Sequence, residues 1–122
     1  MKESIGTQVR VKVVGIGGAG GNAVFRIANK KPQGLELLAL NTDVQALSRI
    51  GSVVTFAVGP ETTGGMGSGG NADLGRKALR ESQEQVRELL EGSDLVFITA
   101  GMGGGTGTGG APMVAEMARK QG

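Results

Sequence analysis

Leu95-Val-Phe-Ile98, an apolar run, leads almost directly into Gly103-Gly-Gly-Thr-Gly-Thr-Gly109, and this junction is the most informative feature of the sequence. The apolar run is typical of a buried strand. The glycine run offers backbone N–H groups that no side chain shields. Ala111-Pro112 then begins a helical stretch, because proline suits a first helical turn. A strand, a glycine turn and a helix N-terminus in this order predict a site that holds phosphate.

Composition limits the function classes that remain. The chain has 122 residues, which is enough for one domain. Its 24 glycines far exceed the usual share of about 7%, and they gather near 15–21, 59–70 and 101–110, so they form specialised loops instead of a repeat. The net charge of +2 and 2% aromatic residues argue against a nucleic-acid partner. A sequence without cysteine or histidine lacks disulfides, thiolate metal ligands and the commonest general base.

No apolar run approaches the roughly 20 residues that a membrane span needs, and the N-terminus lacks the apolar core of a signal peptide. We therefore expect a cytoplasmic protein without direct membrane contact.

The hydrophobic pattern predicts strands alternating with helices. We expect strands at 9–14, 35–40, 53–58 and 95–98, and helices at 22–28, around 46–47 and at 72–91. Asn71 is the expected N-cap of the last of these helices and Gly92 its end. Its expected apolar stripe is Leu74, Ala78, Val86, Leu89 and Leu90, and its expected charged pairs are Arg80–Glu84 and Arg87–Glu91. The predicted fold is α/β, a Rossmann-like parallel sheet with helices on both faces and strand order 3-2-1-4, which leaves strand 95–98 on an open edge.

The first glycine segment contains Gly15-x-Gly17-x-x-Gly20 between a strand and a helix, the spacing of a dinucleotide-binding turn. Asp43 lies 23 residues after Gly20, near the place of a ribose-binding acid. A tight turn without a ligand is the alternative. No GxxxxGK[ST] motif occurs, so phosphate charge must be met by backbone dipoles and a solvated Mg²⁺.

Two further segments leave alternatives open. The segment 59–70 is either a loop that closes on a terminal phosphate or a passive flexible connection. Asn41-Thr42-Asp43 follows the second strand, and Asp43 either caps the next helix or faces phosphate-bound Mg²⁺ or water.

Four stretches together resemble the FtsZ family of tubulin-like cell-division GTPases. They are Val14-Gly-Ile-Gly-Gly-Ala-Gly-Gly-Asn-Ala-Val24, Asn41-Thr-Asp43 with Val-Gln-Ala-Leu47, Gly67-Ser-Gly-Gly-Asn71 with Gly75-Arg-Lys77, and Phe97-Ile-Thr-Ala-Gly-Met-Gly-Gly-Gly-Thr-Gly-Thr-Gly109. They stand in family order and cover nearly the whole chain from Val9.

The resemblance implies guanine-nucleotide binding, with GTP or GDP and Mg²⁺ as ligands. Phosphate and base would be lined by Gly18, Ala19, Gly20, Gly21 and Asn22. Asp43 would stand near the γ-phosphate or the metal. Ser68 and Gly70 would sense the γ-phosphate, and the phosphates would be wrapped by Gly103, Gly104, Gly105, Thr106, Gly107, Thr108 and Gly109. It also implies head-to-tail filaments at the bacterial division site.

The chain departs from the family pattern in two places. Where the family usually reads Thr-Arg-Gly-Leu-Gly-Ala-Gly, this chain has Thr63-Gly-Gly-Met-Gly-Ser-Gly69, which replaces an arginine by Gly64 and leaves the loop more flexible. Gly110-Ala-Pro112 stands in place of Ala-Ala-Pro.

The family's ribose contacts, long central helix and acidic catalytic loop would follow Gly122. We therefore expect a polar lead-in at 1–8, a partial GTP-binding domain at 9–122 made of the first four βα units, and no catalytic residue within the chain. Its partners would be filament subunits, and the missing C-terminal part or a swapped copy. Two alternatives remain: an NAD-binding dehydrogenase fragment, which leaves Gly103–Gly109 unexplained, and a non-catalytic module that caps filaments.

Overall fold

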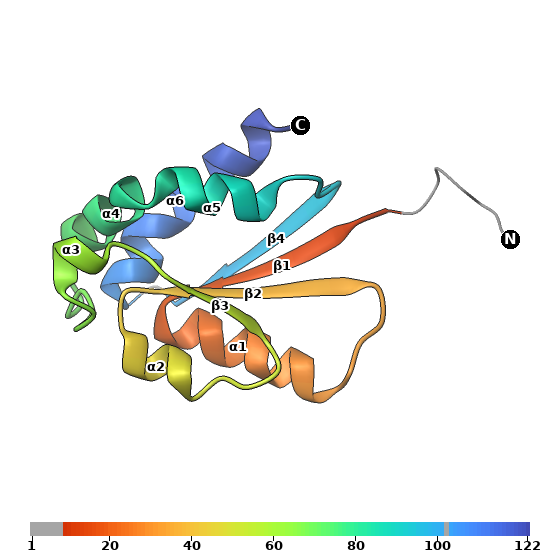
Figure 1. Cartoon of the computed structure of the whole chain (residues 1–122), viewed down its shortest axis with the longest axis horizontal. Coiled ribbons are helices and arrows are strands. Elements are labelled where there is room, and N and C mark those ends of the chain that lie inside the picture. The colour runs from red at the N-terminus through yellow and green to blue at the C-terminus, as the bar shows by residue number, and fades with distance from the viewer. Residues whose placement is uncertain (1–8, 102) are drawn as a thin grey trace, which may run out of the picture.

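The computed structural model describes residues 9–101 and 103–122, so the expected lead-in at 1–8 lies outside the described residues. Four parallel strands form one sheet in the order β3-β2-β1-β4, as the sequence predicted (Figure 1). The strands are β1 (Val11–Ile16), β2 (Leu35–Asn41), β3 (Val54–Ala57) and β4 (Leu95–Ala100). In register, Val13 stands beside Leu37 on one side and Phe97 on the other.

Helices cover both faces of the sheet, which confirms the predicted layers. Figure 1 shows α1 and α2 on one face and α4, α5 and α6 on the other. The helices are α1 (Gly17–Asn29), α2 (Val44–Ser48), α3 (Pro60–Thr63), α4 (Ala72–Glu81), α5 (Gln83–Leu90) and α6 (Gly105–Lys120).

Two helices begin earlier than predicted. Helix α1 starts at Gly17 instead of residue 22, and α6 starts at Gly105 instead of Ala111, so most of both glycine segments is helical. Glycine is a poor helix former, but here it permits contacts that a side chain would block. A Cβ on Gly20, for example, would lie 2.4 Å from the Thr99 carbonyl oxygen. Tertiary packing therefore overrides the local preference.

The prediction of a single helix over 72–91 is also wrong, because the helix is interrupted at Ser82, which separates α4 from α5. The Gly59 N–H donates to Ser82 Oγ over 2.9 Å, which ties the break to the segment before α3. Arg87 pairs with Glu84 instead of Glu91. Asn71 does cap α4, since its Oδ1 accepts from the Leu74 N–H at 3.1 Å.

The main core lies between the sheet and the layer of α4, α5 and α6. Its buried members are Val14, Ile16, Leu38, Leu40, Val58, Leu79, Val86, Leu90, Val114 and Met117. Leu79, which the predicted stripe omitted, is fully buried, whereas Leu74 and Leu89 are half-buried. On β4, Leu95 and Phe97 stay exposed, and within the described chain this strand is an edge of the sheet.

Candidate functional site

The carboxyl edge of the sheet brings together all four segments that the sequence singled out. Helix α1 begins there directly after β1, and α6 begins at Gly105, a few residues after β4 ends at Ala100, and their first turns touch. A Cβ on Gly17 would lie 3.2 Å from the Gly107 nitrogen, and one on Gly101 would lie 2.7 Å from the Ala19 Cβ. The close approach of α1 and α6 makes their N-termini parts of one site.

The N-termini of α1 and α6 differ from those of the neighbouring helices. Neither has a side-chain cap or an acidic residue in its first turn. By contrast, α2 is capped by Asp43 and α4 by Asn71. The first N–H groups of a helix have no partner inside it and carry partial positive charge. The site thus presents two uncapped helix ends, a combination that favours an anion.

The glycines of the site fall into two classes. A Cβ would meet no atom within 4 Å at a set of open glycines, namely Gly18, Gly69, Gly70, Gly103 and Gly104. At a set of packing glycines a Cβ would collide with backbone or a neighbouring side chain; these are Gly15, Gly20, Gly75, Gly105 and Gly109. The interpretation that the whole run Gly103–Gly109 is unshielded is therefore wrong, because Gly105, Gly107 and Gly109 are buried. The open glycines leave room for a ligand at the edge.

Asp43 acts as a helix cap. Its Oδ1 accepts from the N–H groups of Gln45 at 3.0 Å and Ala46 at 3.2 Å, which satisfies the start of α2. Among the described residues no three His, Cys, Asp or Glu side chains gather to hold a metal ion. The described residues therefore offer no protein cage for a Mg²⁺ ion, and such an ion would have to be phosphate-bound and largely hydrated.

The segment 59–70 is ordered by hydrogen bonds. The Glu81 carboxylate accepts from the N–H groups of Glu61 and Thr62 and from Thr62 Oγ1, over 2.6 to 3.1 Å. These hydrogen bonds, with the Thr62 hydroxyl first, hold the pKa of Glu81 below its usual value. Farther along, Met66 forms a bridge with Asp43. The segment is therefore held by Glu81 at Glu61 and Thr62 and by Asp43 at Met66.

A buried cluster of three hydroxyl groups, which we call the hydroxyl cluster, joins three segments at the edge. Thr106 Oγ1 lies 2.7 Å from Thr42 Oγ1 and 3.1 Å from Ser68 Oγ. Sequence reasoning proposed Ser68 and Thr106 but missed Thr42. The available signal was its place directly after β2, at the edge where the other segments meet.

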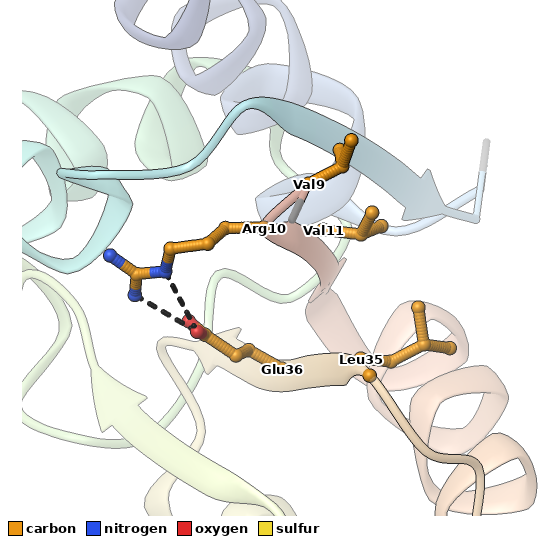
Figure 2. Close-up of a pocket in the computed structure, with 6 residues that line it drawn as sticks. Val9, Arg10, Val11, Leu35 and Glu36 are labelled. Atoms are coloured by element: carbon orange, nitrogen blue, oxygen red, sulfur yellow. Dashed lines mark hydrogen bonds and ion pairs between the residues drawn. The ribbon is translucent and has the colours of Figure 1, made fainter. Parts of the chain in front are cut away.

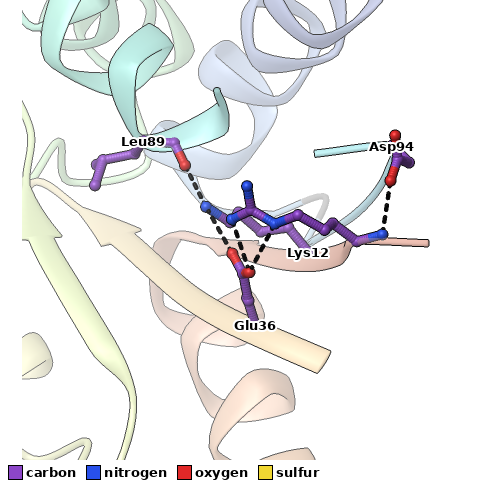
Figure 3. A network of polar contacts seen from close by, with 5 residues as sticks. Lys12, Glu36, Leu89 and Asp94 are labelled. Carbon is purple, nitrogen blue, oxygen red and sulfur yellow. Dashed lines mark hydrogen bonds and ion pairs between the residues drawn. The ribbon is translucent and has the colours of Figure 1, made fainter. Parts of the chain in front are cut away.

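The amino edge of the sheet, opposite this site, carries a different polar network. Arg10 reaches across to Glu36 with its Nη2 2.9 Å from Glu36 Oε2, beside a cavity of about 580 Å³ (Figure 2). Lys12 also pairs with Glu36 and donates to the Leu89 carbonyl oxygen, while the Arg10 N–H donates to Asp94 (Figure 3). The Arg10 and Lys12 contacts hold the pKa of Glu36 below its usual value. Because its charges are paired with one another, this network ties β1 to β2 and to the turn before β4.

The sequence and the fold of the chain match those of a known family. Residues 10–122 match the model of the tubulin/FtsZ family, GTPase domain. The chain is 48% identical over 120 residues to the cell division protein FtsZ of Pseudomonas aeruginosa, covering 98% of this chain and 30% of that protein.

Solved structures agree with the family match. An FtsZ dimer from M. jannaschii superposes with a TM-score of 0.91 at 44% identity, covering 95% of this chain and 34% of that one. A GTPγS-bound protofilament of CetZ2 from Haloferax volcanii gives a TM-score of 0.77 at 29% identity, over 88% of this chain and 35% of that one. The chain thus spans about a third of the length of these relatives. No helix in the described ranges is long and apolar enough to cross a membrane.

Proposed function

Because the chain belongs to the tubulin/FtsZ family, we propose that it is the guanine-nucleotide-binding part of a filament-forming cell-division GTPase. The observation that carries this proposal is the meeting of two uncapped helix N-termini, those of α1 and α6, beside open glycines. Backbone N–H groups at such ends bind phosphate without a lysine.

The proposed ligand contacts follow from position. The phosphates lie against the first turns of α1 and α6, near Gly18, Gly103 and Gly104, where a Cβ would meet no atom. The exposed Asn22 on α1 is the proposed contact to the guanine base. The remaining proposed contacts are Ala19, Gly20, Gly21, Asp43, Ser68, Gly70, Gly105, Thr106, Gly107, Thr108 and Gly109.

We propose binding without turnover by this chain alone. Phosphoryl transfer to water needs a positioned nucleophile and charge stabilisation at the terminal phosphate. In Asp43, the proposed neighbour of the metal, one carboxylate oxygen already accepts the hydrogen bonds that cap α2. Bound Mg²⁺ would neutralise phosphate charge, while the backbone N–H groups of α1 and α6 orient the nucleotide.

Competition against a fluorescent GTP analogue tests the ligand class. We expect GTP and GDP to displace the analogue and ATP and NAD to leave it bound. Displacement by NAD at comparable concentrations would instead support a dinucleotide-binding fragment. Gly18→Ala should bind the analogue more weakly, because its methyl group enters the ligand space. Gly51→Ala is the matched control: Gly51 is exposed and far from this edge, a Cβ there also meets no atom, and the variant should bind like the wild type.

We further propose that β4 pairs with a partner strand, from the rest of a longer protein or from a second copy. The support is the edge position of β4 together with exposed Leu95 (46%) and Phe97 (54%). An unpaired strand edge with apolar side chains favours association. Size-exclusion chromatography of the chain tests the second copy: a dimer or larger species supports it, and a stable monomer at high concentration argues against pairing between copies.

The proposed partners in the cell are other subunits of a head-to-tail filament at the division site. Sedimentation of filaments of an intact relative, with substoichiometric amounts of this chain added, separates nucleotide binding alone from filament capping. A drop in polymer mass supports filament capping, and an unchanged polymer mass excludes it.

A further inference from the structure

The layer of α1 and α2, with the turn that follows α1, carries exposed cations that lack an acidic partner. We call it the cationic layer; within the described ranges none of its cations forms an ion pair, and they are Arg26, Lys30, Lys31 and Arg49. No aspartate or glutamate occurs at 17–35 or at 44–60. The acids next to these ranges are already engaged, because Glu36 pairs with cations of the first strand segment and Asp43 caps α2. In the opposite layer, three arginines instead pair with an acid of their own helix.

The helix ends account for part of this charge. Lys30 and Arg49 are the C-cap residues of α1 and α2, where a cation is favourable. Arg26 and Lys30, however, stand four residues apart and so share one side of α1, where like charges repel each other. An anionic partner on this side would relieve the repulsion.

A cavity of about 260 Å³ lies beside Lys31, between the end of α1 and the beginning of β3. Its lining is largely apolar and includes Ala28, Leu35, Leu37 and Val54. The cavity exists because α2 is short: its five residues rise about 7.5 Å, whereas the seven residues of β2 extend about 23 Å. The volume is below the roughly 300–1,000 Å³ of pockets that enclose a small molecule, and it suits one apolar side chain.

The backbone at the rim of this cavity is unusual. Lys31 has a φ of +52° and Ser52 a φ of +65°, and no other non-glycine residue of the described chain has a positive φ. Both residues line the cavity. Such conformations are uncommon for residues with a side chain, and they cluster at sites that hold a ligand.

The surroundings of the cavity favour a peptide over other anionic partners. No aromatic residue lines the cavity, so a nucleic-acid base has nothing to stack on. Val44 is the one exposed large apolar residue of α1 and α2, which is too few for a helix layer that lies in a lipid surface. By contrast, β3 has no strand on its outer side within the described chain, so its backbone can pair with an extended segment.

We propose that the cationic layer and this cavity together form a docking site for an extended acidic peptide of another protein. One apolar side chain of the peptide enters the cavity, and the flanking carboxylates lie against Lys30 and Lys31. The site lies at the amino ends of β2 and β3, away from the carboxyl edge (Figure 1). Docking there therefore leaves the proposed nucleotide contacts free.

Fluorescence anisotropy of a labelled synthetic peptide, Glu-Glu-Leu-Glu-Glu, tests the proposal with the whole chain. We expect the chain to bind it, and to bind a peptide with glutamine at the four acidic positions about tenfold more weakly at low salt. The double change Lys30→Gln and Lys31→Gln should raise the Kd for the acidic peptide about fivefold. Lys77→Gln with Lys120→Gln, at exposed lysines of the opposite layer, removes the same charge and should leave the Kd unchanged.

Ala28→Leu tests the cavity without changing any charge. Leucine is nearly as good a helix former as alanine, and a thermal melt checks folding. Because its side chain fills the cavity, the variant should bind the leucine peptide only as weakly as the wild type binds Glu-Glu-Gly-Glu-Glu. Binding of the leucine peptide equal to that of the wild type overturns the role of the cavity.

Other outcomes overturn the docking site as a whole. They are equal binding of the acidic and glutamine peptides, equal effects of the two lysine double variants, and no peptide binding by the wild type. Binding to vesicles of anionic phospholipid with no binding of the acidic peptide would assign the cationic layer to a membrane instead. Guanine-nucleotide binding is measured separately by the competition assay and stands or fails independently of these results.

Discussion

Replacing Gly109 by alanine should force apart two helices that touch through their backbones. A Cβ at Gly109 of α6 would lie 2.0 Å from the Ala72 carbonyl oxygen and 2.8 Å from the Arg76 nitrogen of α4. The reciprocal contact is as close, because a Cβ at Gly75 would lie 2.2 Å from the Gly105 carbonyl oxygen. Ordinary contact begins at 3.4 Å, so α6 must retreat by about 1.4 Å against rigid backbone.

The expected loss of stability follows from two opposing terms. Overpacking a close-packed contact costs about 1–3 kcal/mol, and the contact with backbone on α4 places Gly109→Ala at the upper end. Alanine is a better helix former than glycine by about 0.5–1 kcal/mol, which offsets part of this. We expect a net loss of about 2 kcal/mol in the free energy of unfolding, or about 8 °C in Tm for a chain of this size.

Thermal unfolding followed by circular dichroism measures the effect, with Gly18→Ala as the matched control. Gly18 is also helical, but a Cβ there meets no atom within 4 Å, so its Tm should equal or exceed that of the wild type. The same control should bind the fluorescent GTP analogue more weakly, because its methyl group enters the ligand space. A Gly109→Ala variant as stable as the wild type would refute the helix contact.

Three further changes test other parts of the structure. Asp43→Ala should destabilise the chain by about 1 kcal/mol through loss of the α2 cap, whereas Asp43→Asn keeps the cap and should lower only Mg²⁺-dependent nucleotide binding; equal melts of the two variants contradict the cap. Glu81 has a lowered pKa, so its stabilisation of α3 is present above its ordinary value of 4.5 and is lost as the pH falls through the lower pKa of the folded state. The protection factors of the Glu61 and Thr62 amides, which correct for the pH dependence of intrinsic exchange, should therefore fall on acidification in the wild type but start low in Glu81→Gln, with Glu88→Gln as an exposed control. Protection factors that do not change with pH in the wild type count against this cap. Gly64→Arg restores the residue usual in the family at a φ of +66° and should lower the free energy of unfolding by about 1–2 kcal/mol. Gly51→Arg, at a position with equal space and no positive φ, should lower it little. Equal losses of the two variants in urea unfolding would show that the backbone at Gly64 is not the cause.

Local sequence patterns predicted which helices and strands occur better than they predicted where each one begins and ends. The alternating apolar runs and glycine turns predicted a parallel α/β sheet, and the sheet, its doubly wound strand order and the helices on both faces are confirmed. The starts of α1 and α6 were misplaced because helix propensity disfavours glycine, while the deciding contacts come from residues far away in the chain. The break at Ser82 has the same origin, since it depends on a hydrogen bond from Gly59.

The site shows the same division. The sequence allows Asp43 to be either a helix cap or a residue that faces phosphate-bound Mg²⁺ or water. The hydrogen bonds from the Gln45 and Ala46 N–H groups to its carboxylate establish the cap. No spacing rule connects Thr42, Ser68 and Thr106, because their hydroxyl groups meet only when three segments converge.

The fold class and the edge of the sheet that carries the candidate site can both be derived from the sequence pattern. Parallel strands end at one edge, and every glycine segment follows a strand, so the run Gly103–Gly109 had to lie there. The role of each individual glycine, by contrast, depends on how the segments pack in three dimensions. Gly103 and Gly104 are open, whereas Gly105 and Gly109 press against Ser68, Asn71 and Ala72. The physical reason is that a glycine's role depends on which backbone or side chain approaches its Cα, and that neighbour belongs to a distant part of the chain.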